Sequence, residues 1–286
     1  MSEMFTFPRA TIDRKKMVMY RSPVPDWNEE QVKRLASRFR VEGRLRDRGD
    51  RFIVEDENSM FEVFRGSHSI WWTDIATLRN PPSPLAQDDI LSKEEATRRA
   101  LSYLETYNQQ DNRAALEAIS QGMMATIKPS PSAPNTDAKP FSIVANFGFS
   151  LDRLPIFGPG AKMQVTFGAG KQVTEFYKFW REPIEDHERE LLPIEAAIDM
   201  FRRDEAFVDL RQDEARVTIN SIQLGYYAFP PRENQGYLVP IYAFDCVVST
   251  PHLESYEFTD YVVAVPFERD EIKMRRVYEH GSSGVF

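Results

Sequence analysis

The chain has 286 residues, of which 42% are hydrophobic and 28% charged, a balance typical of a folded globular protein. Its net charge of −8 disfavours general binding to phosphate backbones and to anionic membranes, so neither nucleic acid nor a membrane is expected as a partner. The single cysteine, Cys246, excludes an internal disulfide and a multi-cysteine zinc site.

The first 80 residues predict an N-terminal module. A short strand is expected at 18–21, and Asn28 with Gln31 forms a capping box that begins a helix. The apolar stripe of that helix consists of Val32, Leu35, Ala36 and Phe39. Three strands are expected after it, at 51–55, 60–64 and 69–73.

A proline-rich linker at 80–84 precedes a central module at 90–182. Ser92 and Glu95 predict the start of a helix, and a second helix is expected near 111–121. A mobile loop is expected at 128–135 because of its prolines and serines. The strands expected in this module lie at 141–149, 161–167 and 172–180, and Gly168-Ala169-Gly170 joins the last two as a hairpin.

A C-terminal module is expected at 190–286. Pro193 opens a helix, and strands are expected at 216–229, 237–248 and 258–266, with Cys246 as an inert thiol inside the second. A helix followed by three strands thus recurs three times. The recurrence predicts an α+β fold of repeated helix plus antiparallel-sheet modules, with boundaries at 1–80, 90–182 and 190–286.

The most distinctive stretch is Phe147-Gly148-Phe149-Ser150-Leu151-Asp152-Arg153-Leu154-Pro155-Ile156-Phe157-Gly158-Pro159-Gly160, followed by a strand and the glycine hairpin. It resembles PepSY and FTP-type modules, which share a Gly-x-Pro-Val-Phe-Gly element, a strand, a glycine turn and another strand. Residues 191–248, with Leu224-Gly225-Tyr226-Tyr227, resemble the tandem modules of YycH/YycI-type regulators. The resemblance spans about residues 90–265 and implies binding or inhibition rather than chemistry.

The sequence carries no motif for a cofactor, a metal site or a serine nucleophile, so no cofactor and no metal are predicted. The N-terminal residues lack the pattern of a signal peptide, and no run reaches the roughly 18 apolar residues of a membrane span. These features predict a cytoplasmic location. The oligomeric state is left open.

Two carboxylates on otherwise apolar strands are the candidate catalytic residues. Side chains alternate along a strand, so Glu175 shares a face with Tyr177, and Asp245 shares one with Ile241. A carboxylate that faces an apolar cavity has a raised pKa, which suits a general acid or base. The alternative for each is a structural ion pair or an edge position.

Six aromatic and basic side chains are candidate ligand-binding residues, because aromatic walls with polar tips suit a hydrophobic ligand and arginine suits a carboxylate. They are Tyr177, Trp180, Arg181, Tyr226, Tyr227 and Tyr242. The alternative is that the aromatic residues form ordinary sheet core.

Two functions follow from these patterns, and a third, that of a purely structural assembly subunit, is left open. The first is a non-catalytic regulatory protein that binds a peptide, a protein or a hydrophobic small molecule, for example by strand addition at a sheet edge. The second is a cofactor-independent isomerase, cyclase or lyase that acts on a hydrophobic metabolite through Glu175 or Asp245.

Overall fold

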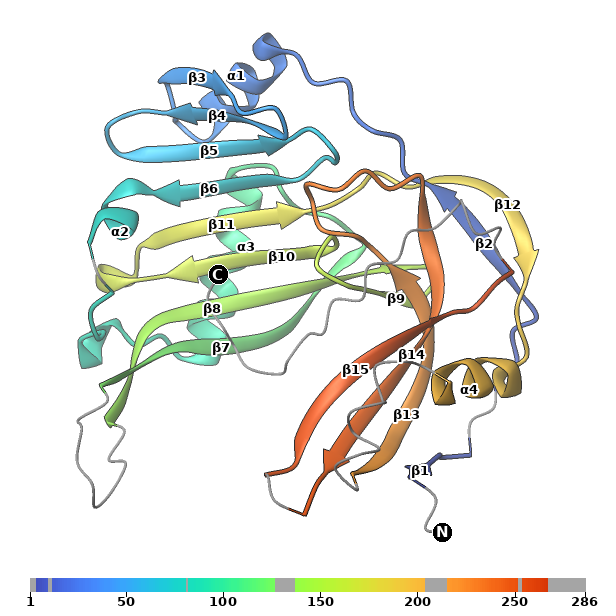
Figure 1. Cartoon of the computed structure of the whole chain (residues 1–286). Coiled ribbons are helices and arrows are strands. Elements are labelled where there is room, and N and C mark those ends of the chain that lie inside the picture. The colour runs from blue at the N-terminus through green and yellow to red at the C-terminus, as the bar shows by residue number, and fades with distance from the viewer. Residues whose placement is uncertain are drawn as a thin grey trace. The chain divides into compact units, whose positions relative to one another are not determined.

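The computed structural model describes residues 4–9, 12–80, 82–126, 137–203, 215–251 and 254–266. The chain forms two compact units, each built from segments distant in sequence (Figure 1). Unit 1 consists of Met1–Ser22, Pro183–Tyr227 and Gly236–Phe286, and unit 2 consists of Pro23–Glu182 and Ala228–Gln235. Among the described residues, no helix has the length and apolar character needed to cross a membrane.

Unit 2 is built around an antiparallel sheet with the strand order β7-β8-β10-β11-β6-β5-β4-β3. Its strands are β3 (Arg44–Asp47), β4 (Arg51–Glu55), β5 (Ser59–Phe64), β6 (Ile70–Asp74), β7 (Ala114–Thr126), β8 (Asp137–Leu151), β10 (Lys162–Phe167) and β11 (Val173–Phe179). The short strand β9 (Leu154–Phe157) folds back on the end of β8. Within the described residues, β7 and β3 are the two edges of this sheet.

Two of the three helices of unit 2 begin where the sequence predicts. In α1 (Glu29–Arg38) the Asn28 side chain accepts from the backbone N–H of Gln31, and the Gln31 side chain accepts from that of Asn28, both at 2.9 Å. In α3 (Lys93–Thr106) the Ser92 hydroxyl accepts from the backbone of Glu95 at 3.2 Å. Both caps are confirmed. The helix α2 (Ile75–Arg79) and two 3-10 turns, η1 (Gln87–Asp89) and η2 (Ala169–Lys171), complete the unit.

An aromatic cluster joins α1 and α3 to the same face of this sheet. Phe39, at the end of α1, stacks on Tyr107, which directly follows α3, with ring centroids 4.9 Å apart. Phe39 also packs on Phe61 of β5 and Phe176 of β11 at 4.9 and 5.7 Å. These contacts place the core of unit 2 between its helices and one face of the sheet. The helices α1 and α3 do not cover the opposite face.

Unit 1 is a second sheet with one helix. Its strands are β1 (Phe5–Thr6), β2 (Lys16–Arg21), β12 (Ile184–Glu190), β13 (Arg216–Tyr227), β14 (Tyr237–Ser249) and β15 (Tyr256–Val263). The strand β14 pairs with β13 on one side and with β15 and β2 on the other. The strand β12 pairs with β2, and β1 runs parallel to β13.

The helix α4 (Ile194–Arg202) follows Pro193 as predicted, and its Phe201 stacks on Phe244 of β14 at 4.5 Å. Cys246 lies nearby on β14 and is fully buried. Burial raises the pKa of this thiol, which keeps it protonated and unreactive at neutral pH. The expectation of a buried cysteine is confirmed.

The prediction of an α+β fold of repeated helix plus sheet modules is wrong. The fold is dominated by its sheets, and the described residues contain fifteen strands but four short α-helices. The strands β12 and β3 were not predicted. β12 is mostly charged and β3 has four residues, so neither has enough apolar residues to show strand alternation. The units also cut across the expected modules at 1–80, 90–182 and 190–286, because β6 and β11 are neighbours in one sheet.

The helix expected near 111–121 is also wrong, because these residues contribute to β7. The alanines, Leu116 and Glu117 favour a helix intrinsically, but pairing with the full length of β8 overrides that weak preference. The loop expected at 128–135 lies outside the described residues.

Candidate functional site

The candidate site lies on the sheet face of unit 2 opposite α1 and α3, which we call the Glu175 face. Along β11 the side chains alternate, and Phe176 turns toward the helices. Glu175, Tyr177 and Phe179 therefore share the opposite face, where all three are half-buried. The alternation of side chains along 172–180 predicts this shared face for Glu175 and Tyr177.

Trp71 of β6 belongs to an aromatic group beside the carboxylate. It lies directly opposite Tyr177 in the β6–β11 pairing, and its Nε1 donates to Oε1 of Glu175 at 2.8 Å. Tyr177 stacks on Phe179 with centroids 4.3 Å apart, and Trp71 meets Phe179 edge-on at 6.3 Å. The carboxylate of Glu175 thus accepts from the Trp71 indole, and Trp71, Tyr177 and Phe179 form a connected aromatic group beside it.

A row of polar side chains continues from Tyr177 toward β7. Gln164 of β10 lies opposite Tyr177, and Asn146 of β8 lies opposite Gln164. The amide Nε2 of Gln164 donates to Oδ1 of Asn146 at 2.6 Å, and Nδ2 of Asn146 donates to Oγ of Ser120 at 2.9 Å. These bonds fix the orientation of two amide groups beside the aromatic group.

The charge of Glu175 is not balanced by a cation. Burial raises its pKa, and the hydrogen bonds from Trp71 and from Thr166 (3.5 Å to Oε2) oppose this rise. Within the described part of the chain no lysine, arginine or histidine pairs with it. By contrast, Glu62 on the next strand, opposite Trp71, lies 2.6 Å from Nε of Arg51. Glu175 is therefore able to gain a positively charged partner.

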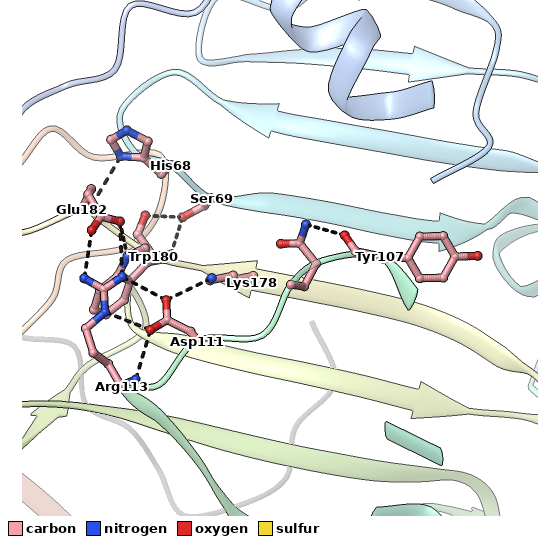
Figure 2. A network of polar contacts seen from close by, with 9 residues as sticks. His68, Ser69, Tyr107, Asp111, Arg113, Lys178, Trp180 and Glu182 are labelled. Carbon is pink, nitrogen blue, oxygen red and sulfur yellow. Dashed lines mark hydrogen bonds and ion pairs between the residues drawn. The ribbon is translucent and has the colours of Figure 1, made fainter. Parts of the chain in front are cut away.

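The predicted ligand residue Trp180 belongs instead to a polar network on the helix side of the sheet (Figure 2). Asp111 accepts from Nε and Nη2 of Arg113 at 2.9 and 3.0 Å and from Nζ of Lys178 at 3.1 Å. Arg113 and the Trp180 indole also donate to Glu182, at 2.8 and 3.0 Å. Two carboxylates face two cations, so this network compensates its own charge and is structural.

Replacing Asp111 with asparagine should destabilise unit 2 in a pH-dependent way. Burial raises the pKa of Asp111, but hydrogen bonds from Arg113 and Lys178 outweigh it and lower the pKa to about 2, from an ordinary value of 3.8. The stabilisation is complete above pH 3.8 and is lost as the pH falls toward 2. We expect Asp111→Asn to cost about 1–2 kcal/mol at pH 7 and roughly half as much at pH 3.

The measurement is urea unfolding followed by tryptophan emission at both pH values. All four tryptophans, Trp27, Trp71, Trp72 and Trp180, lie in unit 2, so their emission reports on that unit. Asp88→Asn, at an exposed position in η1, is the matched control and should change nothing. An equal loss from Asp111→Asn at both pH values would contradict the assigned pKa.

Arg181 is fully buried and its guanidinium is held by main-chain carbonyls. Nη1 donates to the carbonyl of Phe229 at 2.6 Å, and Nη2 donates to those of Pro230 and Glu233 at 2.8 and 2.5 Å. Burial lowers the pKa of Arg181 to about 10. These carbonyls take the donors that a ligand carboxylate would use, so Arg181 anchors the segment Ala228–Gln235 to the end of β11.

The other predicted site residues lie in unit 1. Asp245 is half-buried on β14 between Ser221 and Thr259. The structure thus places the two candidate carboxylates, Glu175 and Asp245, in different units.

The unit 1 tyrosines make structural contacts. The hydroxyls of Tyr226 and Tyr242 donate to the carbonyls of Val18 and Leu192, at 2.9 and 2.7 Å, and Tyr227 packs on Tyr261 at 4.9 Å. Tyr242 also borders an open cleft of about 650 Å³.

Trp71, Gln164 and Asn146 were not predicted as site residues. Alternation within one strand shows which of its side chains share a face, but it does not show which strands are neighbours. Trp71 and Glu175 are separated by 104 residues in sequence. Their contact depends on the pairing of β6 with β11, for which the sequence carries no local signal.

Comparisons with known proteins give a fold and no function. No protein-family model matches the chain, and no curated protein sequence matches it. A crystal structure of an uncharacterized protein from Eubacterium rectale is similar over 96% of this chain and 92% of that chain, with a TM-score of 0.52 and 9% identity. At this identity the likeness shows a shared fold alone. The resemblance to PepSY-type and YycH/YycI-type modules stays a prediction.

Proposed function

We propose that the protein is a non-catalytic binding protein whose Glu175 face takes a ligand with a positively charged amine and a flat apolar body. The observation that carries this proposal is the uncompensated carboxylate of Glu175 beside the connected aromatic group of Trp71, Tyr177 and Phe179. An ammonium group is attracted both to a carboxylate and to the face of an aromatic ring. A flat apolar body gains burial against the same rings.

The raised pKa of Glu175 supports the proposal. In the free protein, burial without a cation disfavours the charged carboxylate. A bound ammonium group favours the charged form and lowers the pKa of Glu175, so binding releases protons wherever the free carboxyl is partly protonated. The alternative, a cofactor-independent enzyme, uses the same carboxyl as a general acid or base and predicts turnover of the ligand.

Replacing Glu175 with glutamine should weaken binding of an aromatic amine at least tenfold, because the amide keeps the shape of the site but removes its charge. Phenethylamine is the probe, and phenethyl alcohol is its uncharged counterpart. Binding is measured by tryptophan emission and by NMR line shifts up to about 10 mM, since probes of this size bind with dissociation constants near 1 mM. Trp71 touches Glu175 and reports on occupancy.

Glu105→Gln, at an exposed position on α3, is the matched control and should bind phenethylamine like the wild type. Equal binding of the amine and the alcohol would overturn the proposal, as would unchanged amine binding by Glu175→Gln. Chemical conversion of the bound amine would favour the enzyme alternative.

A further inference from the structure

The strand β7 forms one edge of the unit 2 sheet. Among the described strands it pairs with β8 alone, so the N–H and C=O groups of its outer side have no strand partner there (Figure 1). Such an edge pairs readily with a further strand unless charges, prolines, bulges or shortness protect it. The two edges of this sheet differ sharply in that protection.

The opposite edge, β3, is protected by charge and shortness, whereas the protection of β7 is limited to two register shifts, at Leu116/Ala118 and Gly122/Met123. β3 has four residues, of which Arg44, Arg46 and Asp47 are charged. β7 has thirteen residues, no proline, no lysine or arginine, and one charged residue, Glu117. Met123 of β7 is also 48% exposed, so the strand carries an apolar side chain that a partner strand can contact. The composition of β7 therefore favours a partner strand.

The one charge of β7 is turned away from its free edge. The carboxylate of Glu117 lies over Gly148 of β8, in the space that a β-carbon at position 148 would occupy. The glycine thus makes room for the carboxylate on the neighbouring strand. A charge held over the sheet does not repel a strand that approaches from outside.

The pattern along β7 is compatible with pairing to itself. Register shifts at Leu116/Ala118 and Gly122/Met123 bound an uncharged run from Ala118 to Gly122, with Ser120 at its centre. Antiparallel pairing of this run about Ser120 places Ala118 of one copy opposite Gly122 of the other. Glu117 and Met123 flank the run at its two ends, so the pairing brings Glu117 of one copy to the same end as Met123 of the other and opposes no like charges.

We propose that two copies of this chain associate through their β7 strands, antiparallel about Ser120, to continue the sheet across a two-fold axis. An interface of this kind is isologous, because the same strand serves both copies. It needs no ligand on the Glu175 face, so it stands or fails independently of the proposed function.

Charge variants at Ser120 test self-pairing directly, because two-fold symmetry brings residue 120 of one copy opposite residue 120 of the other. Ser120→Lys and Ser120→Glu should each raise the dimer dissociation constant at least tenfold, since each opposes like charges. An equimolar mixture of the two variants should restore the dimer through Lys–Glu pairs. The readout is sedimentation velocity of the full chain at up to about 100 µM, which detects dissociation constants of roughly that size.

Ser102→Lys, at an exposed position on α3, adds the same charge away from β7 and should leave the dimer intact. Tryptophan emission identical to wild type shows that each variant keeps the fold of unit 2. The proposal is overturned by a monomeric wild type at the highest concentration, by a Ser120→Lys dimer as tight as wild type, or by a mixture no more dimeric than its components.

Discussion

Replacing Gly160 with alanine should lower the free energy of unfolding of unit 2 by about 3 kcal/mol or more. A β-carbon at this position overlaps the carbonyl oxygen of Phe229 and lies 2.6 Å from Nη1 of Arg181. The carbonyl belongs to the main chain and cannot rotate away as a side chain does. The methyl group must therefore separate two chain segments that the wild type holds in contact.

The effect should be large because Gly160 lies beside the buried guanidinium. The backbone N–H of Gly160 donates to the carbonyl of Ala228 at 3.1 Å, next to the Phe229 carbonyl that accepts from Arg181. Moving Phe229 weakens that hydrogen bond and leaves a buried charge less well solvated. The steric overlap with Phe229 and the weakened hydrogen bond of Arg181 therefore both lower the free energy of unfolding.

Urea unfolding followed by tryptophan emission measures the loss, because the four tryptophans lie in unit 2. Ser102→Ala, at an exposed position on α3 of the same unit, is the matched control. It should stay within about 0.5 kcal/mol of wild type. An unfolding midpoint for Gly160→Ala equal to that of wild type would show that the two segments separate without cost.

Local signals in the sequence predicted the elements that depend on local chemistry. The capping groups of Asn28 and Ser92 act within one helical turn, so their residues alone indicate where α1 and α3 begin. Likewise, alternation within 172–180 placed Glu175 and Tyr177 on one face. The glycine hairpin before β11 is also local, and it is present.

Features that depend on strand order were not predicted. The fold class failed because each helix was grouped with the strands that follow it in sequence, whereas β11 pairs with β6 from the first module. The residues of the Glu175 face were predicted only in part for the same reason, because Trp71 comes from β6. Arg181 was expected to bind a ligand, and nothing local indicates that the carbonyls of residues 229, 230 and 233 surround it.

Asp260 shows how a residue without any motif acquires unusual chemistry from its position. It lies on β15 opposite Phe244, whose ring is stacked on Phe201 of α4. Its Oδ1 accepts from the backbone N–H of Tyr261 at 2.9 Å, while its buried Oδ2 has no hydrogen-bond partner among the described residues. Burial raises the pKa of Asp260 to about 6, and the hydrogen bond from Tyr261 opposes this rise.

This carboxyl should make unit 1 less stable as the pH rises. Between the unfolded pKa of 3.8 and the folded value of about 6, the folded state binds more protons than the unfolded state. The free energy of unfolding therefore falls as pH increases through this window, and the penalty is complete above pH 6. The shift of 6 − 3.8 ≈ 2.2 units corresponds to at most about 3 kcal/mol at 1.36 kcal/mol per unit.

Replacing Asp260 with asparagine should thus stabilise unit 1 by about 1–3 kcal/mol at pH 7 and by almost nothing at pH 4. The asparagine keeps an oxygen for the Tyr261 N–H and removes the buried charge. Hydrogen exchange of peptides from β14 and β15 measures the difference within unit 1, where tryptophan emission is silent. Asp245→Asn on the neighbouring strand β14 is the control and should leave the exchange of these peptides close to that of wild type. If the Asp260→Asn variant is less stable than wild type at pH 7, the carboxylate of Asp260 is solvated or paired. Burial then does not govern the titration of Asp260.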